Sequence, residues 1–299
     1  MNFRFLPYAI FLISILCSPV FSQIEISVLE TTKLMNKGEQ PGLIVDIPQA
    51  STKNVERDWT KLMKKGSKAK VEKDKGHLYI EGVSLEAVAP DPINVYTQLL
   101  ETGDGTRLTV FFEIYGSFLS KVEDEDKFTI AKKIVRNFGV EAYKSAVENE
   151  LKEEEKKLKN FESELERLEK NNEKLHSEIN ENNRRISKSE SEIETSEVDQ
   201  ERKSEQIRIQ KDVIANMVNA QGDELKVAEK TLKSLEGDKR KLENDEESLH
   251  KKIEKYQSEI RQAERDIQKN LEDQENKRRE IGNQKKVSLA VKDKLKNIQ

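Results

Sequence analysis

The C-terminal half of this 299-residue chain repeats apolar residues every seven positions, and this pattern restricts its fold more than any other feature. No proline interrupts the repeat, because all six prolines lie at or before Pro92. Two series lie three residues apart, the first Leu158, Leu165, Ile179, Ile186, Ile193, Ile207 and Ile214, the second Phe161, Leu168, Leu175 and Met217. Alternating spacings of three and four keep one narrow stripe on a single helix face. The pattern predicts a coiled coil over residues 147–299.

The phase of this repeat changes once, and the change predicts that the helix folds back. After Met217 the series restarts four residues late, at Leu225. Such an offset also fits a stutter in one unbroken helix, which is the alternative. Here it coincides with residues 219–223, which include Gly222, and glycine is favoured next to a helix end. We therefore predict an antiparallel hairpin with Gly222 in its turn, and Gly237 is the rival turn position.

Folding the chain back at this turn predicts which residues of the two arms lie opposite each other. Ile207 then meets Leu235, and the polar Asn172 meets Asn270. A polar pair inside an apolar seam fixes the register at some cost in stability. A shift by whole heptads would align the seams equally well. Polar residues also take core positions in the middle of the seam, namely Asn182, Ser189, Ser196, Gln200, Lys203 and Gln210. That stretch therefore bends, is hydrated or receives another chain, and a homo-oligomer through the coiled coil is one alternative.

The N-terminus has the features of a secretory signal peptide. Arg4 precedes an apolar run over residues 5–17, and Val20 and Ser22 occupy the −3 and −1 positions of a cleavage site. We expect residues 1–22 to be removed and the protein to be exported, to the periplasm or cell envelope or out of the cell. An uncleaved membrane anchor is the alternative, and it is the one case in which membrane contact is expected.

Cys17 is the only cysteine and lies within this N-terminal segment. Attachment of a lipid to Cys17 is disfavoured because the bulky Leu16 precedes it. After cleavage the chain would contain no thiol, so neither a disulfide nor a thiolate metal site is expected.

Prolines, glycines and aromatic residues are concentrated before residue 120. This composition predicts a small α+β head over residues 23–120, mainly an antiparallel sheet with one or two packed helices. A connecting helix over 121–146 is expected to follow, loosened at Gly139. Within the head, strands 93–102 and 106–115 form a hairpin, because Gly-Asp-Gly separates two runs of alternating apolar residues.

Alternation along this hairpin assigns each side chain to one of two sheet faces. One face is apolar and carries Ile93, Val95, Thr97, Leu99, Leu108, Val110, Phe112 and Ile114. Tyr96, Phe111 and Tyr115 lie on the opposite face among polar neighbours. These three aromatic side chains are a candidate partner surface. The alternative is that a loop or the following helix covers them.

No catalytic, cofactor-binding or metal-binding motif is found in the sequence. It contains neither a phosphate-binding glycine loop nor a nucleophile elbow, and His77, His176 and His250 are widely separated. The net charge is −4 and no segment is strongly basic, so nucleic acid is not an expected partner. The sequence does not favour an enzyme.

Part of the head resembles uncharacterised exported bacterial proteins. The residues that carry the resemblance are Asp91-Pro92-Ile93-Asn94-Val95-Tyr96, Leu108-Thr109-Val110-Phe111-Phe112 and Gly116-Ser117-Phe118-Leu119-Ser120. It covers roughly residues 50–120 and implies a small α+β domain followed by a helical tail, without implying any activity.

Three functions follow as hypotheses. The first is a non-enzymatic envelope protein that binds an unidentified protein partner and uses the hairpin as a spacer or docking arm. The second is a periplasmic holdase chaperone whose helical arms enclose unfolded clients. The third is a hydrolase with a site in the head, which the absence of a catalytic constellation disfavours.

Overall fold

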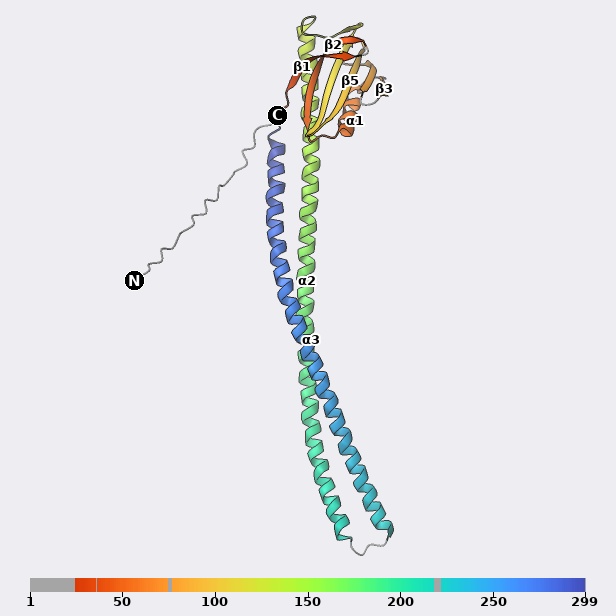
Figure 1. The fold of residues 1–299 in the computed structure, drawn as a ribbon, viewed down its shortest axis with the longest axis vertical. Helices are drawn as coiled ribbons and strands as arrows, with labels where there is room; N and C mark the ends of the chain where they lie inside the picture. The colour runs from red at the N-terminus through yellow and green to blue at the C-terminus, as the bar shows by residue number, and fades with distance from the viewer. Residues whose placement is uncertain (1–24, 36, 75–76, 218–221, 299) are drawn as a thin grey trace, which may run out of the picture. The chain divides into compact units, whose positions relative to one another are not determined.

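The computed structural model describes residues 25–298 except 36, 75–76 and 218–221. The predicted signal peptide, Cys17 and most of the predicted turn lie outside the described residues. The fold class is confirmed: an N-terminal antiparallel sheet with a small helix is followed by a long helical hairpin (Figure 1). The chain divides into two compact units, Met1–Lys156 with Lys285–Gln299, and Lys157–Gln284.

Seven strands and three helices make up the described chain. The strands are β1 (Val28–Met35), β2 (Gly38–Pro48), β3 (Lys70–Asp74), β4 (His77–Val83), β5 (Ile93–Thr102), β6 (Gly105–Ile114) and β7 (Ser117–Phe118). The helices are α1 (Thr52–Met63), α2 (Glu125–Asn216) and α3 (Gly222–Lys296).

The sheet is antiparallel throughout, in the order β1-β2-β6-β5-β4-β3, and β7 also pairs with β6. The predicted parity of the β5–β6 hairpin is confirmed, since Val95 lies opposite Phe112 and Leu99 opposite Leu108. The apolar face of this hairpin is buried. We call it the core face, and the other the open face.

Helices pack on the core face. The N-cap Ser51 accepts a hydrogen bond from the Asn54 amide and starts α1, which buries Val55, Trp59 and Met63. Trp59 is fully buried, its Nε1 donates to Thr97 Oγ1 at 2.9 Å, and its ring meets Phe138 of α2 edge-on at 4.8 Å. The buried indole therefore has both an apolar environment and a hydrogen-bond partner.

The segment predicted as a separate connecting helix over 121–146 is instead the beginning of α2, which starts at Glu125 and continues without interruption beyond residue 146. Gly139, expected to loosen it, lies inside α2, where a Cβ would come within 2.9 Å of Ile26 and Val45 side chains. The glycine therefore allows α2 to lie close to the sheet. In the same unit, Val291 and Ile298 from the C-terminal end of the chain join the core, and Lys294 pairs with Glu150 at 3.0 Å.

In the second unit, α2 and α3 pack along each other as an antiparallel pair (Figure 1). Cross-helix contacts there follow the predicted register. They include Glu164–Lys277, Asn182–Glu259, Lys203–Asp238, Lys211–Glu236 and Gln210 with the Ala228 carbonyl. Gly237 lies inside α3 and is not the turn, and Gly222 is the first residue of α3.

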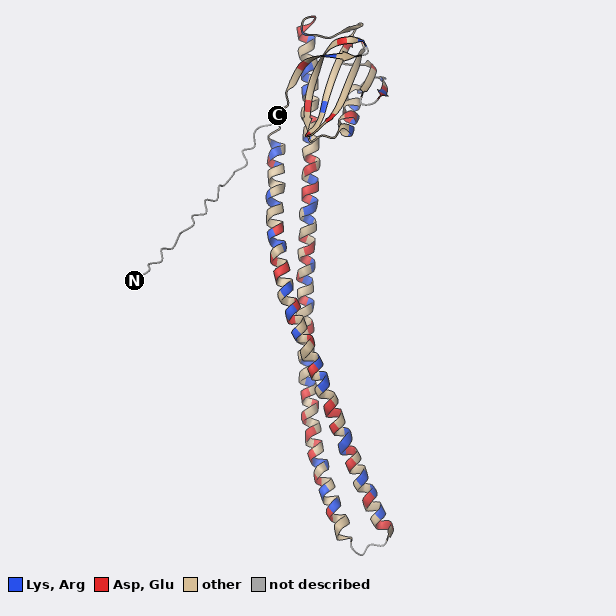
Figure 2. Cartoon of the chain, in the orientation of Figure 1, with Lys and Arg blue, Asp and Glu red and all other residues tan. Residues whose placement is uncertain are grey.

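Charged residues of both signs alternate along the helices (Figure 2). Many form pairs three or four residues apart, such as Lys170–Glu166 and Lys251–Glu247. Exposed pairs of this kind contribute little individually but suit a solvated helix surface. Among the described residues, none of the helices has an apolar stretch long enough to cross a bilayer.

Candidate functional site

The three aromatic residues singled out from the sequence occupy different environments. Phe111 is fully buried, so its side chain is covered in this structure, in line with the alternative interpretation that these aromatic residues are not exposed. It lies outside the main core cluster, on the open face, against Gly42 of the neighbouring strand β2. A Cβ at Gly42 would be 2.6 Å from the Phe111 ring, so the missing side chain of Gly42 makes room for the ring.

Tyr115 lies in the turn between β6 and β7 and is 74% exposed. Tyr115 and Gly116 both have positive φ, as a type I′ turn requires. The Tyr115 hydroxyl donates to Asp91 Oδ2 at 2.8 Å, and this hydrogen bond raises the pKa of the phenol. Tyr115 is therefore held to the rim of the head and is separate from the other two aromatic residues.

Tyr96 is the member of the set that belongs to an organised site. It is half-buried on the open face, with Tyr79 at a ring-centroid distance of 4.8 Å and Phe118 at 5.5 Å. Its hydroxyl donates to Glu113 Oε2 at 3.1 Å. The aromatic rings therefore line one side of a buried carboxylate.

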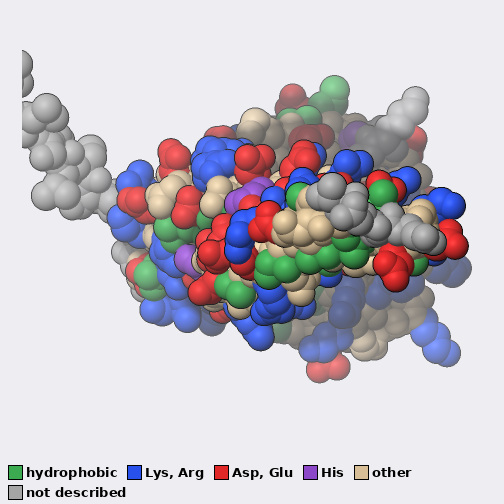
Figure 3. Space-filling view, turned by 90° about the horizontal axis from the view of Figure 1, so that it is seen from below, with side chains coloured by type: hydrophobic (Ala, Val, Ile, Leu, Met, Phe, Trp, Pro, Cys, Tyr) green, Lys and Arg blue, Asp and Glu red, His purple; other side chains and the backbone are tan. Residues whose placement is uncertain are grey.

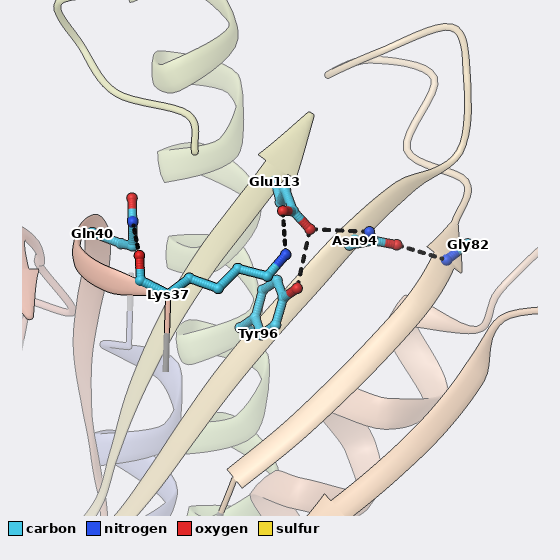
Figure 4. A network of polar contacts seen from close by, with 6 residues as sticks. All are labelled: Lys37, Gln40, Gly82, Asn94, Tyr96 and Glu113. Atoms are coloured by element: carbon cyan, nitrogen blue, oxygen red, sulfur yellow. Dashed lines mark hydrogen bonds and ion pairs between the residues drawn. The ribbon is translucent and has the colours of Figure 1, made fainter. Parts of the chain in front are cut away.

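Glu113 is the centre of this network, which Figure 4 shows in detail. Its Oε2 also accepts from Asn94 Nδ2 at 3.0 Å, and its Oε1 lies 2.5 Å from Lys37 Nζ. Asn94 Oδ1 in turn accepts from the Gly82 amide at 3.4 Å. We call the group Lys37, Asn94, Tyr96, Glu113 and Phe118 the Glu113 site.

Strand alternation explains how the site forms. Glu113 lies directly opposite Asn94 in the β5–β6 pair, and Tyr96 is two residues further along the same face of β5. Phe118 is opposite Glu113 in β7, and Lys37 comes from the loop that joins β1 to β2. Two strand pairings and one loop therefore bring together residues that are far apart in the sequence.

The electrostatics of the site favour an ionised carboxylate. Burial by itself would raise the pKa of Glu113, but hydrogen bonds from Lys37, Asn94 and Tyr96 outweigh it and lower the pKa below the ordinary 4.5. The hydrogen bond to Glu113, which is the larger cause, and the hydrogen bond to Tyr96 raise the pKa of the Lys37 ammonium group. Burial also raises the pKa of Tyr79. At neutral pH the site thus holds a carboxylate and an ammonium group in contact.

The Glu113 site opens into a depression of about 620 Å³ at the junction of β2 and β7. The walls come from the β1–β2 loop, the start of β2 and the segment that follows β6. The lining residues are Lys37, Gln40, Pro41, Glu113, Gly116, Ser117, Phe118, Ser120 and Glu123. Lys37 is half exposed there, whereas only 6% of the Glu113 side chain is exposed. The cation therefore faces the depression and the carboxylate lies beneath it.

The predicted register residues of the hairpin are both in the second unit. Asn270 is 5% exposed and its Oδ1 accepts from Gln274 Nε2 at 2.7 Å on its own helix. Asn172 is half-buried, and its Oδ1 is buried without a hydrogen-bond partner. Of the predicted polar seam positions, Asn182, Ser189 and Ser196 are buried.

Sequence reasoning missed Lys37 and the central role of Glu113. One signal was available, because alternation places Asn94, Tyr96 and Glu113 on one face, and a charged residue inside an apolar strand requires partners. No such signal identifies Lys37, since its position depends on the path of a loop. Within the described part of the chain, no cluster of three or more His, Cys, Asp or Glu residues could hold a metal ion.

Comparisons with known proteins add no functional assignment. No protein-family model matches the chain, and a search of curated proteins found no similar sequence. Among solved structures, the chain is similar to the Smc head domain with a coiled coil and joint from Pyrococcus yayanosii. The identity is 16%, the match covers 89% of this chain and 70% of that one, and the TM-score is 0.16. That score is too low to support an argument about fold or function.

Proposed function

We propose that this is a non-enzymatic exported protein of the cell envelope, whose head binds a protein partner and whose helical hairpin serves as a spacer or docking arm. The observation that carries the proposal is the open face of the sheet. The helices of the head pack on the core face, while the open face carries a polar and aromatic site beside a depression. Binding sites commonly combine such a concave shape with a few convergent polar groups.

Two further observations support this function. The groups of the Glu113 site are paired with one another, with no nucleophile and base in contact as acid–base or covalent catalysis would need. The hairpin carries mixed charges and a seam with polar layers, which suits an exposed arm. Export rests on the signal-like residues 1–22, which resemble those of secreted proteins in composition.

Site-specific photo-crosslinking in the native envelope tests the proposal. A photoreactive amino acid at Ser117, which is exposed on the rim of the depression, should give one cross-linked protein of defined mass. The same group at Lys53, exposed on α1, is the matched control and should not give this product. Equal products from both positions, or none from Ser117, would contradict a partner site on the open face.

One observation favours the holdase as a second candidate. Several apolar side chains on the two helices near the hairpin turn are exposed, namely Ile209, Val213 and Val227. Figure 3 shows apolar side chains on this face of the molecule. An exposed apolar patch can bind unfolded clients.

An aggregation assay separates the two functions. The purified protein is mixed with a denatured client, and light scattering is followed with and without it. A partner-binding protein should leave aggregation unchanged, whereas a holdase should suppress it at stoichiometric ratios. In the holdase case, replacing Ile209, Val213 and Val227 by Ser should abolish the suppression while leaving the seam intact.

A further inference from the structure

The Lys37 ammonium group occupies a place that is built for a cation. It lies 2.5 Å from Glu113 Oε1, 5.3 Å from the centroid of the Tyr96 ring and 6.0 Å from that of Phe118. A carboxylate with adjacent aromatic faces is a favourable environment for an ammonium group. We propose that the Glu113 site binds a primary ammonium group on an alkyl chain, and that Lys37 is the chain's own, displaceable occupant of it. This proposal rests on the partner-binding function proposed above and names the chemistry that its site recognises.

The carboxylate is held in position without Lys37. Asn94 and Tyr96, both on β5, donate to Oε2 and orient the group from below, and Gly82 fixes the Asn94 amide. These contacts belong to the sheet and do not depend on the β1–β2 loop. Glu113 is therefore a preorganised acceptor, and removal of Lys37 would leave Oε1 directed at the depression.

The number of free oxygens favours an ammonium over a guanidinium group. Both hydrogen bonds from β5 use Oε2, which leaves Oε1 as the oxygen available to a ligand. A guanidinium group binds carboxylates best through two parallel hydrogen bonds, one to each oxygen. A single available carboxylate oxygen beside the Tyr96 and Phe118 rings suits an ammonium group, which is compact and whose N–H donors can rotate toward one oxygen. The site should therefore prefer lysine-like over arginine-like ligands.

Lys37 can leave the site at little cost to the fold. Its side chain is half exposed, it lies in the short loop between Met35 and Gly38, and it is not part of the hydrophobic core. Its described contacts beyond the site consist of its carbonyl, which accepts from Gln40 Nε2 at 2.6 Å. Once Lys37 swings out, the depression has room for an alkyl chain, and Glu123 on its rim supplies a second negative charge. An incoming ammonium group would replace the ion pair that Lys37 gives up.

Competition between Lys37 and the ligand makes the proposal testable. The probe is n-butylammonium, which reproduces the end of a lysine side chain, and binding is measured by NMR titration on the full chain. Lys37→Ala should bind the probe roughly tenfold more tightly than the wild type, because a partly exposed ion pair no longer competes. Lys37→Ala combined with Glu113→Gln should lose this binding while keeping the shape of the site.

Matched ligands define the chemistry and its source. Butylguanidinium should bind Lys37→Ala more weakly than butylammonium, and the neutral butanol should not bind. The peptide acetyl-Gly-Lys-Gly-amide forms a second arm. Tighter binding of the peptide than of butylammonium would assign the site to a lysine of a protein partner, and the reverse order would assign it to free alkylamines.

Two results would overturn the proposal. One is equal affinity of wild type and Lys37→Ala for butylammonium, and the other is undiminished binding after Glu113→Gln. Lys37→Gln, which keeps a polar side chain in the loop, serves as a second variant in case Lys37→Ala is poorly folded. The outcome is independent of the photo-crosslinking experiment, so failure of ammonium binding would leave a partner site at Ser117 standing.

Discussion

At the residue scale, Glu113 illustrates how a buried charge is tolerated in a small sheet. A carboxylate removed from water is costly unless hydrogen bonds replace its hydration. Both oxygens of Glu113 are satisfied, one by Lys37 and the other by Asn94 and Tyr96. The Glu113 site therefore contributes stability that depends on the ionised form of the carboxyl group.

The first prediction concerns the pH dependence of stability. The folded-state pKa of Glu113 is lowered, so its contribution is present above the ordinary value of 4.5 and is lost as the pH falls through the folded value. Glu113→Gln should reduce the free energy of unfolding at pH 7 by about 1–3 kcal/mol. Urea unfolding between pH 7 and pH 3 measures this. Between pH 7 and pH 3 the free energy of unfolding should fall more for the wild type than for the variant. If it fell equally for both, the lowered pKa of Glu113 in the folded state would be contradicted.

The second prediction tests the orientation of the sheet. Phe112 is 3% exposed and belongs to the core cluster, so Phe112→Ala should lower the free energy of unfolding of the head by about 3–5 kcal/mol. Tyr115→Ala is the control, because Tyr115 is exposed and its loss should change stability by less than about 1 kcal/mol. Chemical denaturation followed by Trp59 fluorescence reports on both. If the two variants lost similar amounts of free energy of unfolding, the assignment of Phe112 to the buried face would be wrong.

The sequence predicted which face of the sheet the hairpin side chains lie on, but not how buried each side chain is. Alternation placed Tyr96 and Phe111 on one face correctly, since parity along paired strands depends on the backbone alone. Tyr115 lies beyond the end of β6, in the turn to β7, where strand alternation no longer applies. Alternation could not foresee that Gly42, about seventy residues earlier, would leave space for the Phe111 ring. Nor could it place Lys37 over Glu113. Burial on an open face depends on neighbouring strands, whose pairing local patterns do not specify.

At the scale of elements, the helical hairpin was the part best predicted from the sequence. A heptad pattern repeats over many turns, so each residue adds evidence for the same helix face. The phase shift indicated where the helices separate, and α2 ends at Asn216 while α3 begins at Gly222. The connecting helix was less predictable, because Gly139 looks like a breaker in the sequence but is a contact position against the sheet.

Polar residues in the seam lead to the third prediction. Asn182 is 2% exposed and donates to Glu259 at 3.2 Å across the hairpin. Asn182→Leu should raise the free energy of unfolding by about 1–3 kcal/mol, because an apolar side chain gains more from burial than the amide does. Thermal unfolding monitored by circular dichroism measures the change. Asn183→Leu, at an exposed position, should have no such effect, and a destabilised Asn182→Leu would show that this hydrogen bond matters more than burial.

At the scale of the whole molecule, the chain combines two kinds of stability. The head draws on a core in which the sheet is covered on one face by α1, the start of α2 and the end of α3. The second unit depends on a seam between two helices whose surfaces are charged and solvated. Composition predicted a head over residues 23–120 and a helical remainder, whereas the first unit also includes residues up to Lys156 and the C-terminal segment from Lys285. The sequence could not identify the Glu113 site, which forms only when β5, β6, β7 and the β1–β2 loop come together.

The proposed function involves the whole chain, because the head would bind the partner and the hairpin would serve as a spacer or docking arm. Both roles require that the C-terminal half doubles back in the register described. Ile207 and Leu235 are predicted seam residues on α2 and α3. Lys203 and Lys211 flank Ile207 on α2, and their partners Asp238 and Glu236 lie one to three residues after Leu235 on α3. A cross-link between these two positions therefore tests the fold directly.

The decisive measurement is disulfide formation in a Cys17→Ser background. Ile207→Cys with Leu235→Cys should oxidise to an intramolecular disulfide, because the two side chains belong to the same layer of the seam. Ile207→Cys with Ile267→Cys is the matched control and should stay reduced, since Ile267 lies about 48 Å further along α3. Non-reducing electrophoresis and mass spectrometry of the full chain distinguish the products. A monomeric disulfide in the first pair alone is predicted, whereas only dimer-sized products, or cross-linking of the control pair, would contradict the hairpin.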